Sequence, residues 1–198
     1  MEILKSPSVT IPSLIAAAAP TSPLDWLSLT ILLDQIPRNV FRDASAQIVF
    51  TITDPKALEL ARHIIAAGIP NQPPVAYRMA YRFWFYLPLE HSEELEVQVQ
   101  SVEEHEKMFG EFRGLVAGSV EAVDEDTKRC YGVLVRNKEV LDGWAGALMG
   151  RFVLGHKKLI ERFGRFPHRN EVLGRESTEE EVRFLKEGGE TFGGKKTE

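Results

Sequence analysis

The chain has 198 residues, of which 43% are hydrophobic and 27% are charged, and its formal net charge is −5. This composition excludes an intrinsically disordered chain. The negative charge argues against a general nucleic-acid binder, because phosphate binding needs clustered cations. No run approaches the ~20 apolar residues that span a bilayer. We expect an N-terminal extension at 1–22, a single helical domain at 23–192 and a flexible tail at 193–198.

The first predicted helix begins after Ser22, where an N-cap residue is followed by proline and then by Asp25 at the third helical position. Its apolar positions at helical spacing are Leu24, Leu27 and Ile31. Pro37 is expected to end the helix. Asp34 continues the apolar stripe, so it should point inward and needs a cationic or hydrogen-bonding partner.

Further helices are predicted along the rest of the chain. Their expected ranges are 54–68, 74–87, 89–112, 127–163 with glycine interruptions, and 178–186, the last opened by a capping box at 177–180. The segment 74–87 is rich in aromatic residues and is expected to be a buried central helix. Only 47–52 is typical of a short extended piece, and 114–126 is predicted to be a loop. The fold class is therefore all-α, built of successive antiparallel helix pairs.

Asp34 has two candidate partners, Arg38 and Arg169. Arg38 lies four positions further along, but Pro37 is expected to bend the chain between them. A buried carboxylate of this kind either fixes how two helices meet or belongs to a functional site. The sequence leaves both interpretations open.

His91 precedes Leu95 by four residues and so continues an inward-facing stripe at a helix start. That position suits an acid–base group tuned by its neighbours. Glu94 lies three residues later, and a His-x-x-Glu pair on one helix can also ligate a divalent metal, with or without His168. The helix dipole explains acids at 90, 93 and 94 without any function. No metal is predicted, and the metal site stays an alternative.

His168, Arg169 and Asn170 follow Pro167 on a loop between two predicted helices, where side chains are presented rather than packed. The surrounding stretch is the most basic part of the chain. A carboxylate or phosphate group could dock there through guanidinium hydrogen bonds. Alternatively, these arginines pair with helix ends and with the acidic segment at 90–94.

The remaining histidines and the single cysteine have simpler interpretations. His156 falls on a packed face and is read as a core histidine, whereas His63 and His105 have polar neighbours and are predicted to be solvated. Cys130 is read as a small buried residue, and one unpaired cysteine suits a reducing compartment, so a cytoplasmic location is expected. Phosphate-loop, dinucleotide, zinc-protease and serine-hydrolase motifs do not occur.

Three segments, LLDQIPRNVFR, LPLEHSEELEVQVQSVE and FGRFPHRNEVLGREST, resemble in sequence and order the uncharacterised family of the domain of unknown function nine hundred and twenty-four. The resemblance covers residues 24–192. It implies an all-helical, tetratricopeptide-like arrangement and no established general activity. The chain departs from the family in a short helical portion before Asp34 and a long, divergent segment at 114–143.

The hypothesis from these segments is a pocket for a small anionic metabolite, with acid–base chemistry as the candidate activity. The expected catalytic residues are Asp34, His91 and His168, and the expected ligand-binding residues are Arg38, Asn39, Glu94, Arg169 and Asn170. The alternative is a tetratricopeptide-like module that binds a peptide or protein without catalysis. Cofactor and oligomeric state are left open.

Overall fold

The computed structural model describes residues 6, 8–119 and 124–192, and within these ranges the protein is all-α, as predicted, without a strand. The helices are α2 (Ile11–Ala18), α3 (Pro23–Val40), α4 (Asp54–Ala66), α5 (Met79–Arg82), α6 (Leu87–Glu90), α7 (Leu95–Val116), α8 (Glu125–Arg136), α9 (Lys138–Ala147), α10 (Leu154–Phe163) and α11 (Glu179–Lys186). Short 3-10 and π-helical turns join several of them. None of the helices in these ranges is long and apolar enough to cross a membrane.

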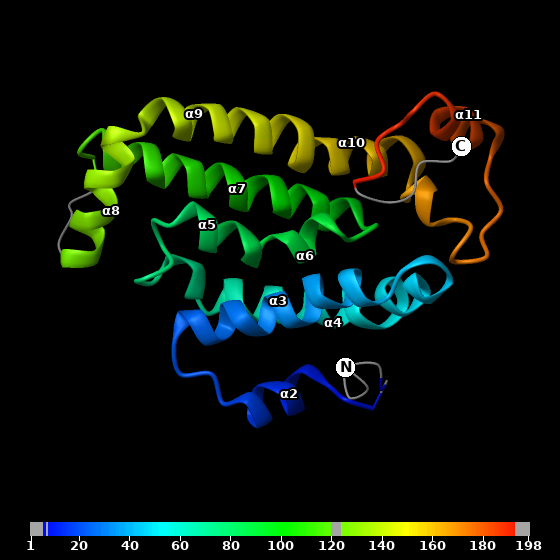
Figure 1. Ribbon diagram of the computed structural model, residues 1–198, viewed down its shortest axis with the longest axis horizontal. Coiled ribbons are helices and arrows are strands. Elements are labelled where there is room, and N and C mark those ends of the chain that lie inside the picture. The colour runs from blue at the N-terminus through cyan, green and yellow to red at the C-terminus, as the bar shows by residue number, and fades with distance from the viewer. Residues whose placement is uncertain (1–5, 7, 120–123, 193–198) are drawn as a thin grey trace.

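The chain runs back and forth in layers (Figure 1). α2 lies at one edge, α3 and α4 form the next layer, and α6, α7 and the α9–α10 run follow in that order. Successive long helices run antiparallel, α3 against α4 and α7 against the α9–α10 run, which agrees with the predicted helix pairs. The tetratricopeptide-like arrangement stays a prediction.

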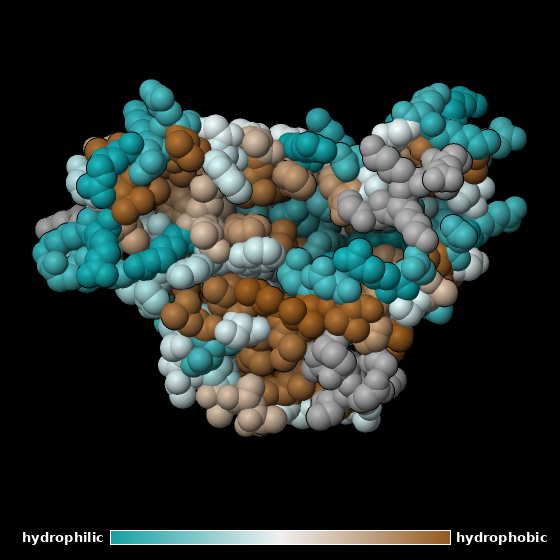
Figure 2. Space-filling model, viewed as in Figure 1, coloured by the Kyte–Doolittle hydropathy of each residue, from teal (hydrophilic) through white to brown (hydrophobic). Residues whose placement is uncertain are grey.

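The predicted N-terminal extension contains α2, which contacts α4 and buries Ile11 in the main core with 2% of its surface exposed. The predicted tail at 193–198 lies outside the described residues. Figure 2 shows an apolar band along the side of α3 and down onto α2. The domain boundaries stay a prediction.

The start of α3 follows the predicted signal. The Ser22 hydroxyl accepts the Asp25 N–H at 3.3 Å, and the Asp25 carboxylate accepts the Ser22 N–H at 2.8 Å. α11 also begins with a capping box, but its pair is Thr178 and Glu181, one residue later than predicted. Each box satisfies N–H groups that a helix start leaves free.

The main hydrophobic core lies between the layers, and a second, smaller core holds the C-terminal segment. The small core contains Leu159, Ile160 and Phe166, with Phe163, Phe184 and Phe192 packed against it. It anchors the loop at 164–178 to α10. Cys130 in α8 is buried, as predicted, and burial raises its thiol pKa.

Pro37 does not end α3, contrary to prediction. The helix continues to Val40, and the Phe41 N–H still donates to the Pro37 carbonyl at 2.7 Å. A proline in the last turn removes only one hydrogen bond of the helix, so three further residues remain helical. Asp34 and Arg38 therefore lie one helical turn apart on one face.

The extended piece predicted at 47–52 is also wrong, because the chain forms a π-helical turn at Val49–Thr53 that leads into α4. The segment is rich in β-branched residues, which favours a strand. Val49 and Thr53 are nevertheless 1% and 0% exposed, because a helical turn points both toward the core. Tertiary burial outweighs the local preference here.

Two predicted helices are broken in the structure. Instead of one buried helix at 74–87, there are turns, then α5 and a 3-10 turn at Phe83–Phe85, and Tyr81 is 39% exposed. The helix predicted at 89–112 is interrupted at 91–94, between α6 and α7. The loop predicted at 114–126 shortens to the segment between Val116 and Glu125, of which 120–123 lie outside the described residues.

Candidate functional site

A half-open cavity of about 470 Å³ lies at the end of the molecule where α4, the link between α6 and α7, and the C-terminal loop meet. Its wall is formed by Phe50, Asp54, Pro55, Leu58, Glu59, Arg62, Pro88, His91, Ser92, Glu93, Glu94, Arg169 and Leu173. All three segments singled out in the sequence reach this region, though not with every predicted side chain.

Asp34 lies behind the cavity wall and is 1% exposed, which confirms its inward direction. Its Oδ1 is 2.7 Å from His91 Nδ1, its Oδ2 accepts from Gln35 Nε2 at 2.5 Å, and Arg38 Nη2 is 3.7 Å from Oδ1. Burial alone would raise the pKa of Asp34, but the charge and hydrogen bond of His91, with Arg38 and Gln35, outweigh it and lower the pKa to about 2. Asp34 is therefore ionised at neutral pH.

His91 lies in the link between α6 and α7, and its side chain is 15% exposed on the cavity. An ionised carboxylate can only accept a hydrogen bond, so Asp34 holds the His91 proton on Nδ1. Whenever the ring is neutral, its Nε2 is then the free acceptor. An orienting carboxylate behind a histidine with one free nitrogen is the arrangement that general-base catalysis uses.

Gln98 in α7 holds this link in place. Its Nε2 lies 2.8 Å from the Glu90 carbonyl and 2.6 Å from the Ser92 carbonyl, on either side of His91. The side chain is completely buried. Because one amide binds a carbonyl on each side of His91, the His91 backbone has a defined position.

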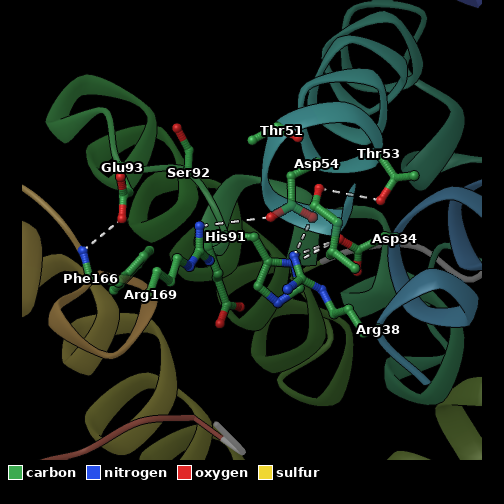
Figure 3. Close-up of polar contacts among 12 residues, drawn as sticks. Asp34, Arg38, Thr51, Thr53, Asp54, His91, Ser92, Glu93, Phe166 and Arg169 are labelled. Atoms are coloured by element: carbon green, nitrogen blue, oxygen red, sulfur yellow. Dashed lines mark hydrogen bonds and ion pairs between the residues drawn. The ribbon is translucent and has the colours of Figure 1, made fainter. Parts of the chain in front are cut away.

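Asp54 opens α4 and joins two arginines from distant parts of the chain (Figure 3). Arg38 Nη2 donates to its Oδ1 at 2.6 Å, and Arg169 Nη1 is 3.7 Å from its Oδ2. Arg38 thus contacts both Asp34 and Asp54, and it fixes the distance between α3 and the start of α4.

Arg169 is 6% exposed and lies between two aromatic rings. Its guanidinium carbon is 4.5 Å from the Phe50 ring centre and 4.4 Å from that of Phe166. Its guanidinium makes no hydrogen bond with the described residues, and Nε is buried without a partner. Burial, with repulsion by Arg38, outweighs the attraction of Asp54 and lowers its pKa to about 10, so it remains charged at neutral pH.

Glu93 ties the C-terminal loop to the α6–α7 link. Its Oε1 accepts the Phe166 N–H at 2.8 Å, and Arg175 donates to both carboxylate oxygens at 2.6 and 3.0 Å. Burial would raise the pKa of Glu93, but Arg175 and the Phe166 N–H lower it overall. These contacts join residues 73 and 82 positions apart, and they bring Arg169 to the cavity.

A second, fully buried cluster lies beyond the cavity wall. Glu90 Oε1 is 3.4 Å from His105 Nε2, and its Oε2 is 3.3 Å from His156 Nδ1. Both histidines point Nδ1 at carbonyl oxygens, those of Ser101 and Phe152, each at 2.8 Å. A carbonyl only accepts, so Nδ1 carries the proton and His105 Nε2 faces Glu90 as an acceptor.

Glu90 Oε1 and His105 Nε2 face each other without a hydrogen bond between them, and a neutral acid avoids placing a buried charge against this acceptor. Burial, with the nearby charge of Asp34, raises the pKa of Glu90 to about 8. Burial lowers the pKa of His105 to about 4 and, with repulsion from His91, that of His156 to about 3. The cluster carries no net charge at pH 7.

The other predicted ligand-binding residues differ in their positions. Glu94 lines the cavity rim, 66% exposed and 3.7 Å from Arg62. Asn39 lies outside the cavity on the surface, where it donates to the Gln35 carbonyl at 2.9 Å. Asn170 is buried and donates to the Ser177 hydroxyl at 3.0 Å, so it braces the C-terminal loop.

His168 does not line the cavity. Its ring lies against Phe166 with ring centres 5.7 Å apart, and its Nδ1 is buried without a hydrogen-bond partner among the described residues. Burial, with repulsion from Arg169, lowers its pKa to about 3, so this histidine is neutral at pH 7.

The remaining histidines test the sequence interpretation. His63 is exposed and His156 is buried, as predicted, but His105 is completely buried, so its predicted solvation is wrong. Within the described ranges, no group of three or more His, Cys, Asp or Glu side chains is arranged to hold a metal ion.

Several residues of the site were not predicted. Asp54 was taken only as a helix start, and Glu90 and Glu93 were explained by the helix dipole. No sequence pattern pointed to Phe50 or Arg62. Asp54 and Glu93 form ion pairs with residues far away in the chain, and helical periodicity contains no trace of such pairs.

The fold and the cavity define an all-helical protein with a buried acid–histidine pair beside a pocket. Residues 12–189 match the family described as "Bacterial protein of unknown function (DUF924)", and the chain belongs to this family. It is also similar to a solved structure, "Structure of Protein of Unknown Function ATU0120 from Agrobacterium tumefaciens", with 30% identity and a TM-score of 0.57. That similarity covers 84% of this chain and 70% of the other. No curated protein matches the sequence.

Proposed function

We propose that the protein binds a small molecule with an anionic group in this cavity and acts on it by acid–base chemistry through His91. The observation that carries the proposal is the contact of 2.7 Å between His91 Nδ1 and Asp34, which leaves Nε2 as the free acceptor of a cavity side chain. Asp34 orients the ring and stabilises its protonated form. His91 is thus the proton-exchanging group.

Arg169 is the proposed anion-binding group. It lines the cavity as a charged guanidinium with no hydrogen bond from the described residues, and Arg38 lies close enough to lower its pKa by repulsion. An anion near three guanidiniums, those of Arg38, Arg169 and Arg175, gains attraction from each of them. A carboxylate is the simplest such group.

The polar inner wall also favours a small molecule over a peptide-binding module. Asp54, His91 and Arg169 are mostly buried, whereas an interaction groove is expected to present exposed side chains. Phe50, Leu58 and Leu173 supply an apolar wall against which a small ligand can pack. His168, behind Phe166, is proposed to act only by supporting Arg169.

We expect sodium hexanoate, a simple carboxylate, to bind the protein, and Arg169→Gln to weaken that binding roughly tenfold, because a charge-assisted hydrogen bond is lost. His91→Gln is expected to weaken it by a smaller factor, and to reduce turnover of any substrate on the order of 100-fold. Isothermal titration calorimetry measures the first effect, and mass spectrometry of a metabolite extract incubated with each variant measures the second.

Arg151→Gln is the matched control, because Arg151 is 73% exposed and pairs with Glu190 outside the cavity. It should bind hexanoate as the unaltered protein does. Equal affinities in all three variants would show that the anion does not bind at Arg169. Unchanged turnover in His91→Gln would remove the acid–base assignment.

A further inference from the structure

The inner end and the rim of the cavity differ in their charged groups. At the inner end, Asp54 is held by Arg38 at 2.6 Å and Glu93 by Arg175 at 2.6 Å, so each wall carboxylate already has its own guanidinium. Arg169 is the third cation there, 3.7 Å from Asp54. Asp34 lies behind the wall, where His91 and Gln35 hydrogen-bond to it. The three guanidiniums thus balance the three carboxylates, and Arg169 is the cation there whose guanidinium makes no hydrogen bond with the described residues.

The exposed rim has an excess of carboxylates. Glu59 and Arg62 lie one turn apart on α4, and Glu94 is 3.7 Å from Arg62. The rim thus holds two carboxylates and one guanidinium. The Arg62 and Glu94 side chains are 50% and 66% exposed, and Glu59 is exposed too, so all three remain accessible to a ligand.

Apolar side chains also line the cavity. They are Phe50, Pro55, Leu58, Pro88 and Leu173. Within about 470 Å³, the lining thus combines a buried guanidinium, apolar side chains and a pair of exposed carboxylates. A ligand that matches this set carries an anion at one end, a cation at the other and methylene groups between them.

We infer that the ligand of this cavity is an amino-carboxylate whose carboxylate binds Arg169 and whose protonated amine lies between Glu59 and Glu94. This inference rests on the proposed function and specifies its ligand class. The buried arginine provides most of the affinity, because its charge is shielded from water. The exposed rim adds little affinity, because exposed ion pairs contribute little. It distinguishes a ligand with an amine from one without.

Three ligands of matched length test the inference: 6-aminohexanoate, hexanoate and hexylamine. Isothermal titration calorimetry at low ionic strength should give 6-aminohexanoate an affinity roughly threefold to fivefold above that of hexanoate, with hexylamine the weakest. High salt should reduce this advantage, because it screens exposed charges.

The double variant Glu59→Gln with Glu94→Gln should bind 6-aminohexanoate and hexanoate equally well. Glu96→Gln is the matched control, an exposed carboxylate at the start of α7 that does not line the cavity. It should keep the preference for the amine. Because these side chains are exposed, the variants are expected to fold normally.

The outcomes separate the two proposals. Equal affinities for 6-aminohexanoate and hexanoate, or an amine preference that persists in the double variant, would overturn the inference and leave the anion site intact. Two results would overturn both the inference and the anion site. One is that hexylamine binds and hexanoate does not. The other is that Arg169→Gln leaves the affinities for 6-aminohexanoate and hexanoate unchanged.

Discussion

Replacing Glu90 with glutamine is expected to abolish a loss of stability that the unaltered protein shows between about pH 6.5 and 8. The pKa of Glu90 rises from 4.5 in the unfolded chain to about 8 in the folded one. The folded state holds the extra proton in this range, so stability falls as the pH rises. The loss amounts to about 2 kcal/mol, at 1.36 kcal/mol for each pH unit.

The acid side of the profile has the opposite slope. His105 and His156 have pKa values lowered from 6.5 to about 4 and about 3, so their contribution to stability is complete above pH 6.5 and is lost as the pH falls toward those values. The two histidines outweigh Glu90 below pH 6.5. Urea unfolding at a series of pH values should show a maximum near pH 6.5, and Glu90→Gln should keep the acid limb only.

Glu90→Ala distinguishes a neutral acid from a merely packed side chain. It leaves a void beside His105 and His156, so it should cost about 3–5 kcal/mol. Glutamine has the shape and the donor of the neutral acid and should cost about 1 kcal/mol near pH 6.5. If glutamine destabilises as much as alanine there, Glu90 is ionised in the folded protein and the cluster carries charge.

Arg82→Met is expected to lower the free energy of unfolding by about 3–5 kcal/mol, because it leaves the acceptors around a completely buried guanidinium without their donor. The guanidinium is completely buried at the end of α5. It donates to the side chains of Glu111 at 2.5 Å, Asn71 at 2.7 Å and Tyr86 at 3.0 Å, and to the Ala76 carbonyl at 3.1 Å. Methionine fills much of the volume but satisfies none of these acceptors. Urea denaturation measures the change.

Arg78→Met is the matched control. Arg78 also makes an ion pair with a distant carboxylate, Asp126, at 2.5 Å, but its side chain is 27% exposed and that of Asp126 is 30% exposed. Water can replace the lost contacts, so the cost should be about 1 kcal/mol. Comparable losses for both variants would mean that the burial of Arg82 does not determine its contribution.

The helices themselves were largely predictable, because caps, glycine stops and apolar periodicity are local signals. Asp34 is the best example for the site, since a carboxylate on an apolar stripe had to point inward, and it does. The resemblance of three segments to one family brought His91 and Arg169 into the same hypothesis. The positions of these residues follow from contacts with Asp34 and Phe166.

The wrong prediction for His105 and the missed role of Glu90 have a common physical cause. The buried face of α7 includes Gln98, Ser101 and His105, polar residues at helical spacing that hydrophobic periodicity reads as a solvated face. Gln98 donates to carbonyls at 90 and 92, and His105 lies against Glu90 and donates to the Ser101 carbonyl. His105 was therefore assigned to solvent, and Glu90, which faces it, to the helix dipole.

The convergence of ion pairs at the cavity was beyond local reasoning. Arg38 meets Asp54 across 16 residues and Arg175 meets Glu93 across 82. Such pairs depend on how layers stack, and a single sequence carries no record of it. The continuation of α3 past Pro37, which brings Arg38 beside Asp34, depends in the same way on the position of the proline in the last turn.

Nitrogen-15 NMR of the histidine side chains, recorded while sodium hexanoate is added, tests the central claim most directly. The account predicts that His91 carries its proton on Nδ1, and that its Nε2 resonance shifts on titration while that of exposed His63 does not. A His91 ring protonated on Nε2 alone, or an Nε2 resonance that hexanoate leaves unmoved, would contradict the account.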